Sequence, residues 1–372
     1  MKRQNKTIGT ITFHSSYNHG SCLQAYALQK YINTEYPEYS YNIINLRTDR
    51  QKDFYKRPYN KLNLKTAIKR IVFFGYKKKF IGRRKNFEEF ISSKLNVTRE
   101  YKSLDELKDA DLKYDYYISG SDQLWNHALL DFDWSFFLEF CNSGIRLSYA
   151  ASFGSKAEEW SESDFKRAKS DLGKYDFLSV REKASAEVVK KIIGVVPEIH
   201  ADPTLLIDEE KWKELAGSRM IDGDYIFMYD LKGLKRTYDV AKKLSKRYNM
   251  PVVITRENSK KHLLYNFDKR YDAGPVEFLN YLSHAKIVVS SSFHGTVFSI
   301  LFKKPFVSID GAKDFRIKNL LNKMNLMDRA ITSKDDLEKM DDIFNVDFSD
   351  CDKVLYDERM KTKKYFDTVF GK

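Results

Sequence analysis

Residues 287–302 read IVVSSSFHGTVFSILF. The apolar run 287–289 ends in three serines and an apolar periodicity then continues to Phe302, which predicts a buried strand, a sharp polar turn and the start of a helix. At such a turn, unpaired backbone N–H groups and the positive end of the helix dipole favour a phosphate or a carboxylate. His294 lies at this turn, and a histidine there can transfer protons near neutral pH. The alternative is a histidine that caps the helix or packs beneath the turn.

The length and composition of the chain limit the class of protein to which it can belong. It has 372 residues, of which 42% are hydrophobic. Two domains of about 150–200 residues are therefore expected, and wholesale disorder is excluded. No apolar run approaches the roughly 18 residues that a membrane span needs, and no signal-peptide hydrophobic region follows the basic start. The three cysteines lie far apart without metal spacing, which indicates reduced thiols and a cytoplasmic protein.

Strand-like and helical runs alternate along the whole chain, which is typical of parallel sheets covered by helices. The alternation starts at Thr7–Phe13 and begins again at Tyr225–Tyr229, after the charged stretch 208–224. We therefore expect an α/β protein of two Rossmann-like domains, an N-terminal one over residues 1–207 and a C-terminal one over residues 208–372. An amphipathic terminal helix is expected to pack back on the body.

Four turns that follow strand-like runs carry polar side chains. Ligands of open α/β sheets bind outside the carboxyl ends of the strands, so these turns are the places where chemistry is expected. They span residues 14–21, 118–126, 178–182 and 290–294. The first turn lacks the glycine-rich fingerprints of NAD and ATP sites.

Two of these turns hold side chains with two interpretations each. Asp122 is either a helix cap or a partner for a sugar hydroxyl, with Trp125 as a stacking face. Arg181 is either a bidentate clamp for a carboxylate or phosphate, or the partner of a salt bridge to Glu182 or Asp202.

The net charge of +13 is unevenly placed along the chain. Between Arg50 and Lys85 the only acid is Asp53, and basic residues alternate with apolar and aromatic ones. A segment of this kind indicates attraction to an anionic membrane surface. A solvated helix packed on the first domain is the other interpretation. No nucleic-acid-binding motif accompanies the basic residues, so nucleic acid is not an expected partner.

Taken together and in this order, the polar turns resemble the polysaccharide pyruvyl transferase family. The matching motifs extend over most of the chain. They are residues 18–29, 120–126, 149–154, 179–182, 202–206 and 292–296. The basic insert at residues 50–90 carries none of them.

The resemblance implies a GT-B-type fold, with two Rossmann-like domains facing a cleft. It also implies transfer of pyruvate from phosphoenolpyruvate to two hydroxyls of a sugar, forming a cyclic ketal. The sugar would belong to a bacterial-type surface polysaccharide or to its lipid-linked precursor. This reaction needs a general acid/base and fixed cations, because the donor carries a carboxylate and a phosphate. No cofactor and no metal are implied.

The matching positions assign roles to particular residues. His294 is the expected general acid/base, and Arg181 is expected to bind the anionic groups of the donor; these two are the expected catalytic residues. The other expected donor contacts are Ser292, Gly295 and a second cation, either Lys313 or Arg316. The residues expected to bind the acceptor are Ser15, Asn18, Gly20, Asp122, Gln123 and Trp125.

The expected partners are phosphoenolpyruvate and a glycan or polyprenyl-diphosphate-linked sugar acceptor. A lipid-linked acceptor would place the protein at the inner face of the cell membrane, with residues 50–85 against anionic lipid. The nearest alternative is a GT-B-type glycosyltransferase that uses a nucleotide sugar. A catalytically silent, membrane-associated scaffold is another, although the presence of both His294 and Arg181 argues against it.

Overall fold

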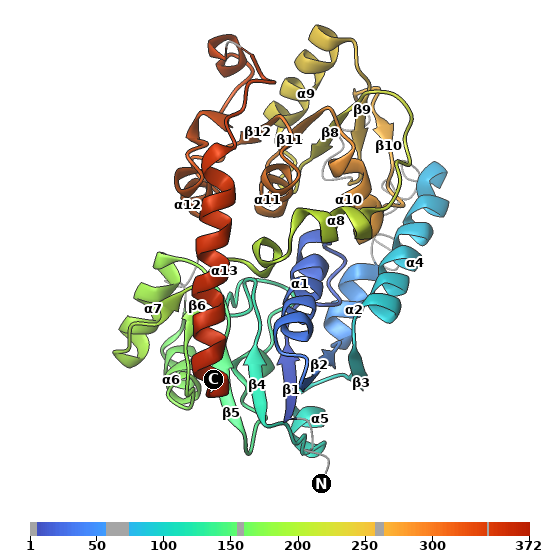
Figure 1. Cartoon of the computed structure of the whole chain (residues 1–372). Coiled ribbons are helices and arrows are strands. Elements are labelled where there is room, and N and C mark those ends of the chain that lie inside the picture. Colours follow the sequence, from blue (N-terminus) through green and yellow to red (C-terminus); the bar gives the residue numbers. More distant parts are fainter. Residues whose placement is uncertain (1–5, 57–73, 155–159, 257–263, 341) are drawn as a thin grey trace. The chain divides into compact units, whose positions relative to one another are not determined.

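The structure, a computed structural model, describes residues 6–56, 74–154, 160–256, 264–340 and 342–372 (Figure 1). The chain divides into two compact units. The first unit comprises Met1–Phe74, Glu88–Ile207 and Glu358–Lys372, and the second comprises Gly75–Phe87 and Asp208–Asp357.

Two helices contribute to both units, and here the division differs from the two continuous ranges predicted from the sequence. Helix α4 (Lys77–Lys94) begins in the second unit and ends in the first, and helix α13 (Ser349–Phe370) does the same. A long helix can pack different turns against different cores, which a division by sequence order does not capture. The terminal helix packs back on the first unit as expected, since the ring of Phe366 stacks on Tyr149 with centroids 5.1 Å apart.

The first unit is built on a parallel sheet. Among the described residues this sheet has five strands in the order β3-β2-β1-β4-β5, with β1 paired to β2 on one side and to β4 on the other. The strands are β1 (Lys6–Ile11), β2 (Tyr39–Leu46), β3 (Val97–Tyr101), β4 (Tyr116–Ser119) and β5 (Ile145–Ser148). Its helices, besides α4 and α13, are α1 (His19–Glu35), α2 (Asp49–Lys56), α5 (Leu104–Asp109), α6 (Glu162–Leu172) and α7 (Lys183–Ile193).

A two-stranded parallel sheet, β6 (Ser179–Val180) and β7 (Glu198–Ile199), continues this unit. An isolated bridge joins Ala151 to Val180, and another joins Leu147 to Phe177. The turn that carries Arg181 therefore lies beside the turns that follow β4 and β5.

The second unit has a six-stranded sheet in the described part of the chain, ordered β10-β9-β8-β11-β12-β13 and parallel throughout. Counted from its first strand, this is the 3-2-1-4-5-6 order of the Rossmann fold. The strands are β8 (Ile226–Tyr229), β9 (Val252–Ile254), β10 (Asp268–Lys269), β11 (Ile287–Ser290), β12 (Phe306–Ile309) and β13 (Ala330–Ile331). The helices are α8 (Glu209–Ala216), α9 (Lys235–Tyr248), α10 (Pro275–Ser283), α11 (Phe293–Leu301) and α12 (Phe315–Lys323).

The strand orders locate a candidate site in each unit. In a doubly wound sheet, ligands bind at the point where the strand order reverses. In the first unit this point lies between the ends of β1 and β4, and in the second between the ends of β8 and β11. Three of the four polar turns noted in the sequence follow β1, β4 and β11, while the turn that follows β8 was not singled out.

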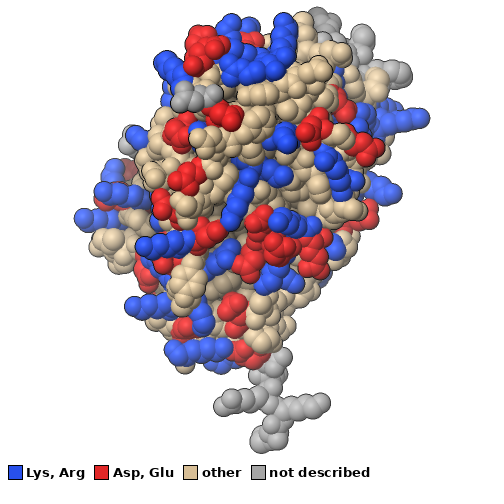
Figure 2. All heavy atoms as spheres, turned by 45° about the horizontal axis from the view of Figure 1, so that its top comes forward, with Lys and Arg blue, Asp and Glu red and all other residues tan. Residues whose placement is uncertain are grey.

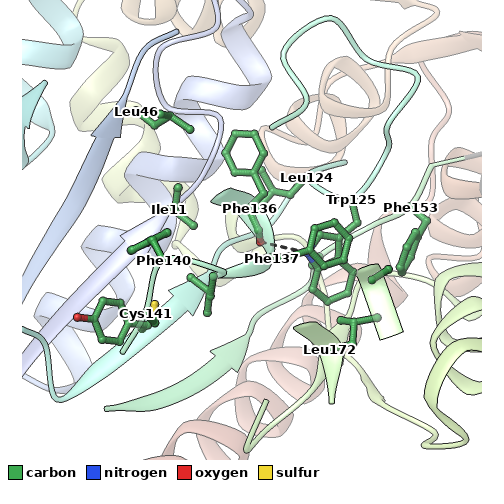
Figure 3. Close-up of a cluster of buried hydrophobic side chains, with 14 of the residues drawn as sticks. Ile11, Leu46, Leu124, Trp125, Phe136, Phe137, Phe140, Cys141, Phe153 and Leu172 are labelled. Carbon is green, nitrogen blue, oxygen red and sulfur yellow. Dashed lines mark hydrogen bonds between the residues drawn. The ribbon is translucent and has the colours of Figure 1, made fainter. Parts of the chain in front are cut away.

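An aromatic core supports the strand ends of the first unit. Trp125 is fully buried in it, with its indole stacked on Phe137 at 5.4 Å between ring centroids (Figure 3). The indole N–H donates a hydrogen bond to the backbone oxygen of Phe136 at 3.2 Å. The sequence-based expectation that Trp125 offers a stacking face to a sugar is therefore wrong, because the large apolar ring is taken up by the core.

The basic segment predicted to contact a membrane is only partly described. Residues 57–73 lie outside the described residues, and the part from Lys77 onward forms helix α4. One of its cations, Arg83, is buried and lies over the ring of Phe87 at 5.4 Å. On the face drawn in Figure 2, basic and acidic side chains are interspersed and no single sign of charge dominates.

Candidate active site

The strand ends of the first unit are joined by a buried polar network around Asp122. This residue follows β4 with a φ of 82°, a conformation that a non-glycine side chain rarely adopts. Its Oδ2 accepts a hydrogen bond from the Ser21 hydroxyl at 2.7 Å, and its Oδ1 accepts one from the backbone N–H of Gln123 at 2.9 Å. The Arg181 guanidinium lies 3.6 Å from Oδ1. Backbone strain held in place by such contacts is a common feature of functional sites.

Arg181 has two further carboxylate partners. Its Nη1 lies 2.9 Å from Asp202 Oδ2, and its Nε lies 3.5 Å from Glu182 Oε2. Only 4% of the side chain is exposed. Burial alone would lower the pKa of Arg181, but the charges of Asp122, Glu182 and Asp202 outweigh it and raise the pKa. The guanidinium is therefore always charged.

The charge of this network bears on the two interpretations of Arg181. One guanidinium faces three carboxylates, so the group carries an excess of negative charge. An excess of negative charge suits hydroxyl groups that donate hydrogen bonds, and it opposes a phosphate or carboxylate. The geometry matches the salt-bridge interpretation. The donor-binding role of Arg181 stays a prediction.

The other predicted acceptor residues lie at the same sheet edge. The Asn18 side chain caps helix α1 by accepting from the backbone N–H of Gly20 at 3.1 Å. Ser15 is buried after β1, and its hydroxyl accepts a hydrogen bond from the amide of Gln51 on α2 at 3.4 Å. Gln123 accepts a hydrogen bond from the Asn126 side chain at 3.0 Å. Of the six predicted acceptor residues, the structure removes only Trp125 from the edge.

In the second unit, the turn 290–296 forms a tight cradle at the start of α11. Ser292 caps the helix, with its hydroxyl 3.5 Å from the backbone N of Gly295. A Cβ atom on Gly295 would overlap the Ser290 hydroxyl, so only glycine lets the helix approach the strand this closely. His294 is 8% exposed, and its ring lies 5.3 Å from that of Phe293. Ser292, His294 and Gly295, which the sequence predicts as donor contacts, therefore lie at the cap and in the first turn of α11.

Cations surround this second sheet edge. Arg316 donates hydrogen bonds to both carboxylate oxygens of Asp314, at 3.2 and 3.0 Å, and its guanidinium lies 5.9 Å from the centre of the Phe293 ring. Lys313 is 65% exposed and lies 3.4 Å from Asp310. Arg316 therefore lies beside the residue that precedes His294, which favours it over Lys313 as the second cation.

Sequence reasoning missed two cations at this edge. Lys232 follows β8 and lies 3.5 Å from Asp314, and Arg236 in the first turn of α9 pairs with Asp310. Both side chains are 38% exposed. The signal was available, because they follow the predicted strand Tyr225–Tyr229 in the same way that His294 follows the next central strand.

The balance of charge at the second edge is opposite to that at the first. Four cations, Lys232, Arg236, Lys313 and Arg316, stand against three carboxylates, Asp230, Asp310 and Asp314. The charge of Asp230 is already engaged, since the carboxylate accepts hydrogen bonds from Ser291 and from the backbone N–H of Leu234. Burial alone would raise the pKa of Asp314, but the Arg316 hydrogen bonds and the nearby Lys232 charge lower it to about 2.

In the described part of the chain, no group of three or more His, Cys, Asp or Glu residues is arranged to hold a metal ion. Among the same residues, no helix has the length and the apolar character to cross a membrane.

Solved structures similar to this chain have the same fold. A protein named as a UDP-N-acetylglucosamine 2-epimerase from Listeria monocytogenes aligns with a TM-score of 0.56 and 10% identity, covering 96% of this chain and 91% of its own. The UDP-GlcNAc 2-epimerase from Methanocaldococcus jannaschii aligns with a TM-score of 0.53 and 14% identity, covering 92% and 93%. These likenesses confirm the expected fold class, two Rossmann-like α/β units of the GT-B type.

Sequence comparisons are more specific. No curated protein matches the chain significantly. A family model described as polysaccharide pyruvyl transferase matches residues 18–312, which include both sheet edges. This match extends over well more than half of the 372 residues. The chain belongs to the polysaccharide pyruvyl transferase family.

Proposed function

We propose that this protein transfers pyruvate from phosphoenolpyruvate to two hydroxyls of a sugar, forming a cyclic ketal. The observation that carries the proposal is the opposite charge of the two sheet edges. The second unit offers accessible cations and a capped helix start, and the first unit offers buried carboxylates. Membership of the pyruvyl transferase family supports the same assignment.

The donor is proposed to bind at the second edge. Phosphoenolpyruvate carries a phosphate and a carboxylate, and both groups favour fixed cations and a helix N-terminus. Arg316 and Ser292 lie next to the start of α11, and the more exposed Lys313 follows β12. In this proposal Arg316 is the principal cation and Lys313 a weaker one.

The proposed chemistry gives His294 two tasks. As an acid it adds a proton to the methylene carbon of the donor, and the electron pair of the C=C bond forms the new C–H bond. The first sugar hydroxyl then attacks the resulting oxocarbenium-like carbon and gives up its proton to a base. Phosphate leaves with the electron pair of its C–O bond, and the second hydroxyl closes the ketal and loses its proton. An imidazole can both donate and accept a proton at its ring nitrogens, so a histidine suits both directions of proton transfer.

The acceptor is proposed to bind at the first edge. Neutral sugar hydroxyls can donate hydrogen bonds to Asp122, and the excess negative charge there would repel the donor's anionic groups. Arg181 would then act by holding Asp122 and Asp202 in place. The proposed acceptor class is a surface polysaccharide or its lipid-linked precursor.

The first experiment is a thermal-shift titration of the full chain with phosphoenolpyruvate, UDP-glucose and GDP-mannose. A ligand that binds only the folded state stabilises it by RT ln(1 + L/Kd), where L is the ligand concentration, so Tm rises with L once this exceeds Kd. We expect a concentration-dependent shift with phosphoenolpyruvate alone. Arg316→Gln should reduce this shift, and Lys318→Gln, an exposed lysine on the same helix, should leave it unchanged.

Two results would contradict the proposal. A shift with a nucleotide sugar instead of phosphoenolpyruvate would indicate the glycosyltransferase alternative. No shift with any of the three, together with no phosphate release from phosphoenolpyruvate in the presence of bacterial lipid-linked glycans, would indicate a protein without this activity.

Membrane contact by residues 50–85 stays a prediction, because residues 57–73 lie outside the described residues. It is tested by sedimentation of the protein with vesicles of phosphatidylglycerol at low and at high salt. An electrostatic contact predicts co-sedimentation that high salt abolishes.

A further inference from the structure

A cluster of aromatic and charged side chains lies at the first sheet edge and is not used by the proposed reaction. The rings of Tyr17, which follows β1, and Tyr55 on α2 lie 5.2 Å apart. Phe54 lies 5.0 Å from Tyr55 and is 37% exposed, so the aromatic row extends to the surface of this unit. We call Tyr17, Phe54 and Tyr55 the aromatic row.

Each tyrosine of the row is held by a carboxylate. The Tyr17 hydroxyl donates to Glu88 and the Tyr55 hydroxyl donates to Asp131, in the loop that follows β4. Glu88 is in turn bound by Arg47 Nη1 at 2.9 and 3.1 Å. The rings are thereby fixed in orientation, which lowers the entropic cost of binding a ligand against them.

Only one of the two carboxylate oxygens of Asp131 accepts a hydrogen bond among the described residues. Its Oδ2 accepts from Tyr55, but its Oδ1 is buried and has no hydrogen-bond donor in the described part of the chain. Burial raises the pKa of the Asp131 carboxyl, the Tyr55 hydrogen bond lowers it, and the charges of Asp122 and Arg50 raise and lower it further. A buried carboxylate oxygen without a donor costs free energy unless a water or a ligand meets it.

The cluster is continuous with the proposed acceptor site. Asp122 and Asp131 lie in the same loop after β4, and Gln51, one helical turn before Tyr55 on α2, donates to the Ser15 hydroxyl after β1. An acceptor sugar at Asp122 would therefore have its neighbouring residue within reach of the aromatic row. Aromatic faces beside a few fixed polar groups are the usual composition of a small-molecule subsite.

We propose that the aromatic row and Asp131 form a second sugar subsite, which binds the neutral pyranose next to the modified sugar in an acceptor glycan. The inference rests on the proposed function for the identity of the acceptor site. A pyranose ring offers C–H groups to Tyr55 and Phe54, and its hydroxyls donate to Asp131. The subsite makes the protein selective for an acceptor of two or more sugars.

The test measures sugar binding without the donor. Saturation-transfer difference NMR on the full chain gives Kd for methyl pyranosides of glucose, galactose, mannose and N-acetylglucosamine, and for a β-linked disaccharide of each. We expect at least one disaccharide to bind about tenfold more tightly than its monosaccharide. Tyr55→Leu and Asp131→Asn should each remove that advantage and leave the monosaccharide Kd unchanged.

Matched control variants distinguish loss of the subsite from a general loss of folding. Tyr356→Leu removes a tyrosine that is 60% exposed on α13, and Asp109→Asn removes an exposed acid on α5. Both should keep the disaccharide advantage. Tyr55→Phe keeps the ring and loses only the hydroxyl that holds Asp131, so it should lose part of the advantage without loss of folding.

The outcomes are distinct from those of the donor titration. If no disaccharide binds better than its monosaccharide, or if the advantage survives in Tyr55→Leu and Asp131→Asn, the subsite is overturned. If the disaccharide result is as expected while phosphoenolpyruvate produces no thermal shift, the subsite stands and the proposed donor is wrong.

Discussion

The two sheet edges of this protein have the same topology and opposite charge. In each unit polar turns follow the central strands where the strand order reverses. In the first unit the guanidinium of Arg181 faces the three carboxylates of Asp122, Glu182 and Asp202, and these four side chains are almost fully buried. At the edge of the second unit the four cations outnumber the three carboxylates, and Lys232, Arg236 and Lys313 are a third or more exposed. Topology thus determines where ligands bind, whereas the side chains on the turns determine which ligand.

The largest effect is expected at His294. His294→Gln should lower the rate of pyruvate transfer by about 10²–10⁴-fold, because the proposed acid/base is removed. The thermal shift with phosphoenolpyruvate should remain, since the cations stay in place. His284→Gln in the same unit is the control, as this half-buried histidine bonds to the Asn280 backbone oxygen instead of lying at the sheet edge. Equal turnover of the His294 variant and the wild type would remove His294 from the mechanism.

The next effect concerns the stability of the first edge. Arg181→Gln leaves three buried carboxylates without their cation and should cost about 3–5 kcal/mol in the free energy of unfolding. Urea unfolding of the variant and of the wild type measures this.

The control for that variant is Arg167→Gln, which breaks a more exposed pair with Glu139 and should cost at most about 1 kcal/mol. Adding Asp122→Asn to Arg181→Gln should recover part of the stability. If Arg181→Gln is as stable as the control and instead abolishes phosphoenolpyruvate binding, the donor role of Arg181 is correct and our division of roles between the two edges is wrong.

A smaller effect is expected for the cations of the second edge. Arg316→Gln should weaken phosphoenolpyruvate binding by about 10- to 100-fold, the effect of losing a charged hydrogen bond. Lys313→Gln should weaken it by only about two- to threefold, because the lysine is 65% exposed and strongly solvated. Isothermal titration calorimetry ranks the two. The reverse order would make Lys313 the principal donor contact.

The smallest effect is the pH dependence of the Asp314–Arg316 pair. Because the folded pKa of Asp314 is lowered to about 2, the pair contributes stability above the unfolded pKa of about 4 and loses it as the pH falls toward 2. The stability difference between the wild type and Arg316→Gln should therefore be about 2 kcal/mol at pH 6 and shrink below pH 4. A difference that stays constant with pH would mean that the pair does not hold Asp314 charged.

The sequence was most informative where local pattern decides structure. The run 287–302 produced the expected strand, turn and helix start, since apolar periodicity, serines and glycine act within a few residues of each other. The expected α/β class was confirmed for the same reason. The division into continuous domains was wrong for α4 and α13, because the core that each end of a helix contacts depends on distant segments.

The site residues show the same contrast between what local pattern determines and what distant contacts determine. Their places after strands followed from the sequence, and so did Glu182 and Asp202 as partners of Arg181, but most of the other contacts did not. Trp125 looked like a stacking face and proved to be core, while Tyr55 on α2 and Asp131 after β4 met across 76 positions of sequence.

The sequence by itself determined the two Rossmann-like units, the polar turns at their strand ends and the family, because these depend on short-range pattern and on motifs in order. Only the tertiary structure decided that Asp122 joins Glu182 and Asp202 around Arg181, and that Lys232 and Arg236 pair with Asp314 and Asp310 at the second sheet edge. The physical reason is that the charge of a site depends on side chains from several strands, and folding alone brings their ends together.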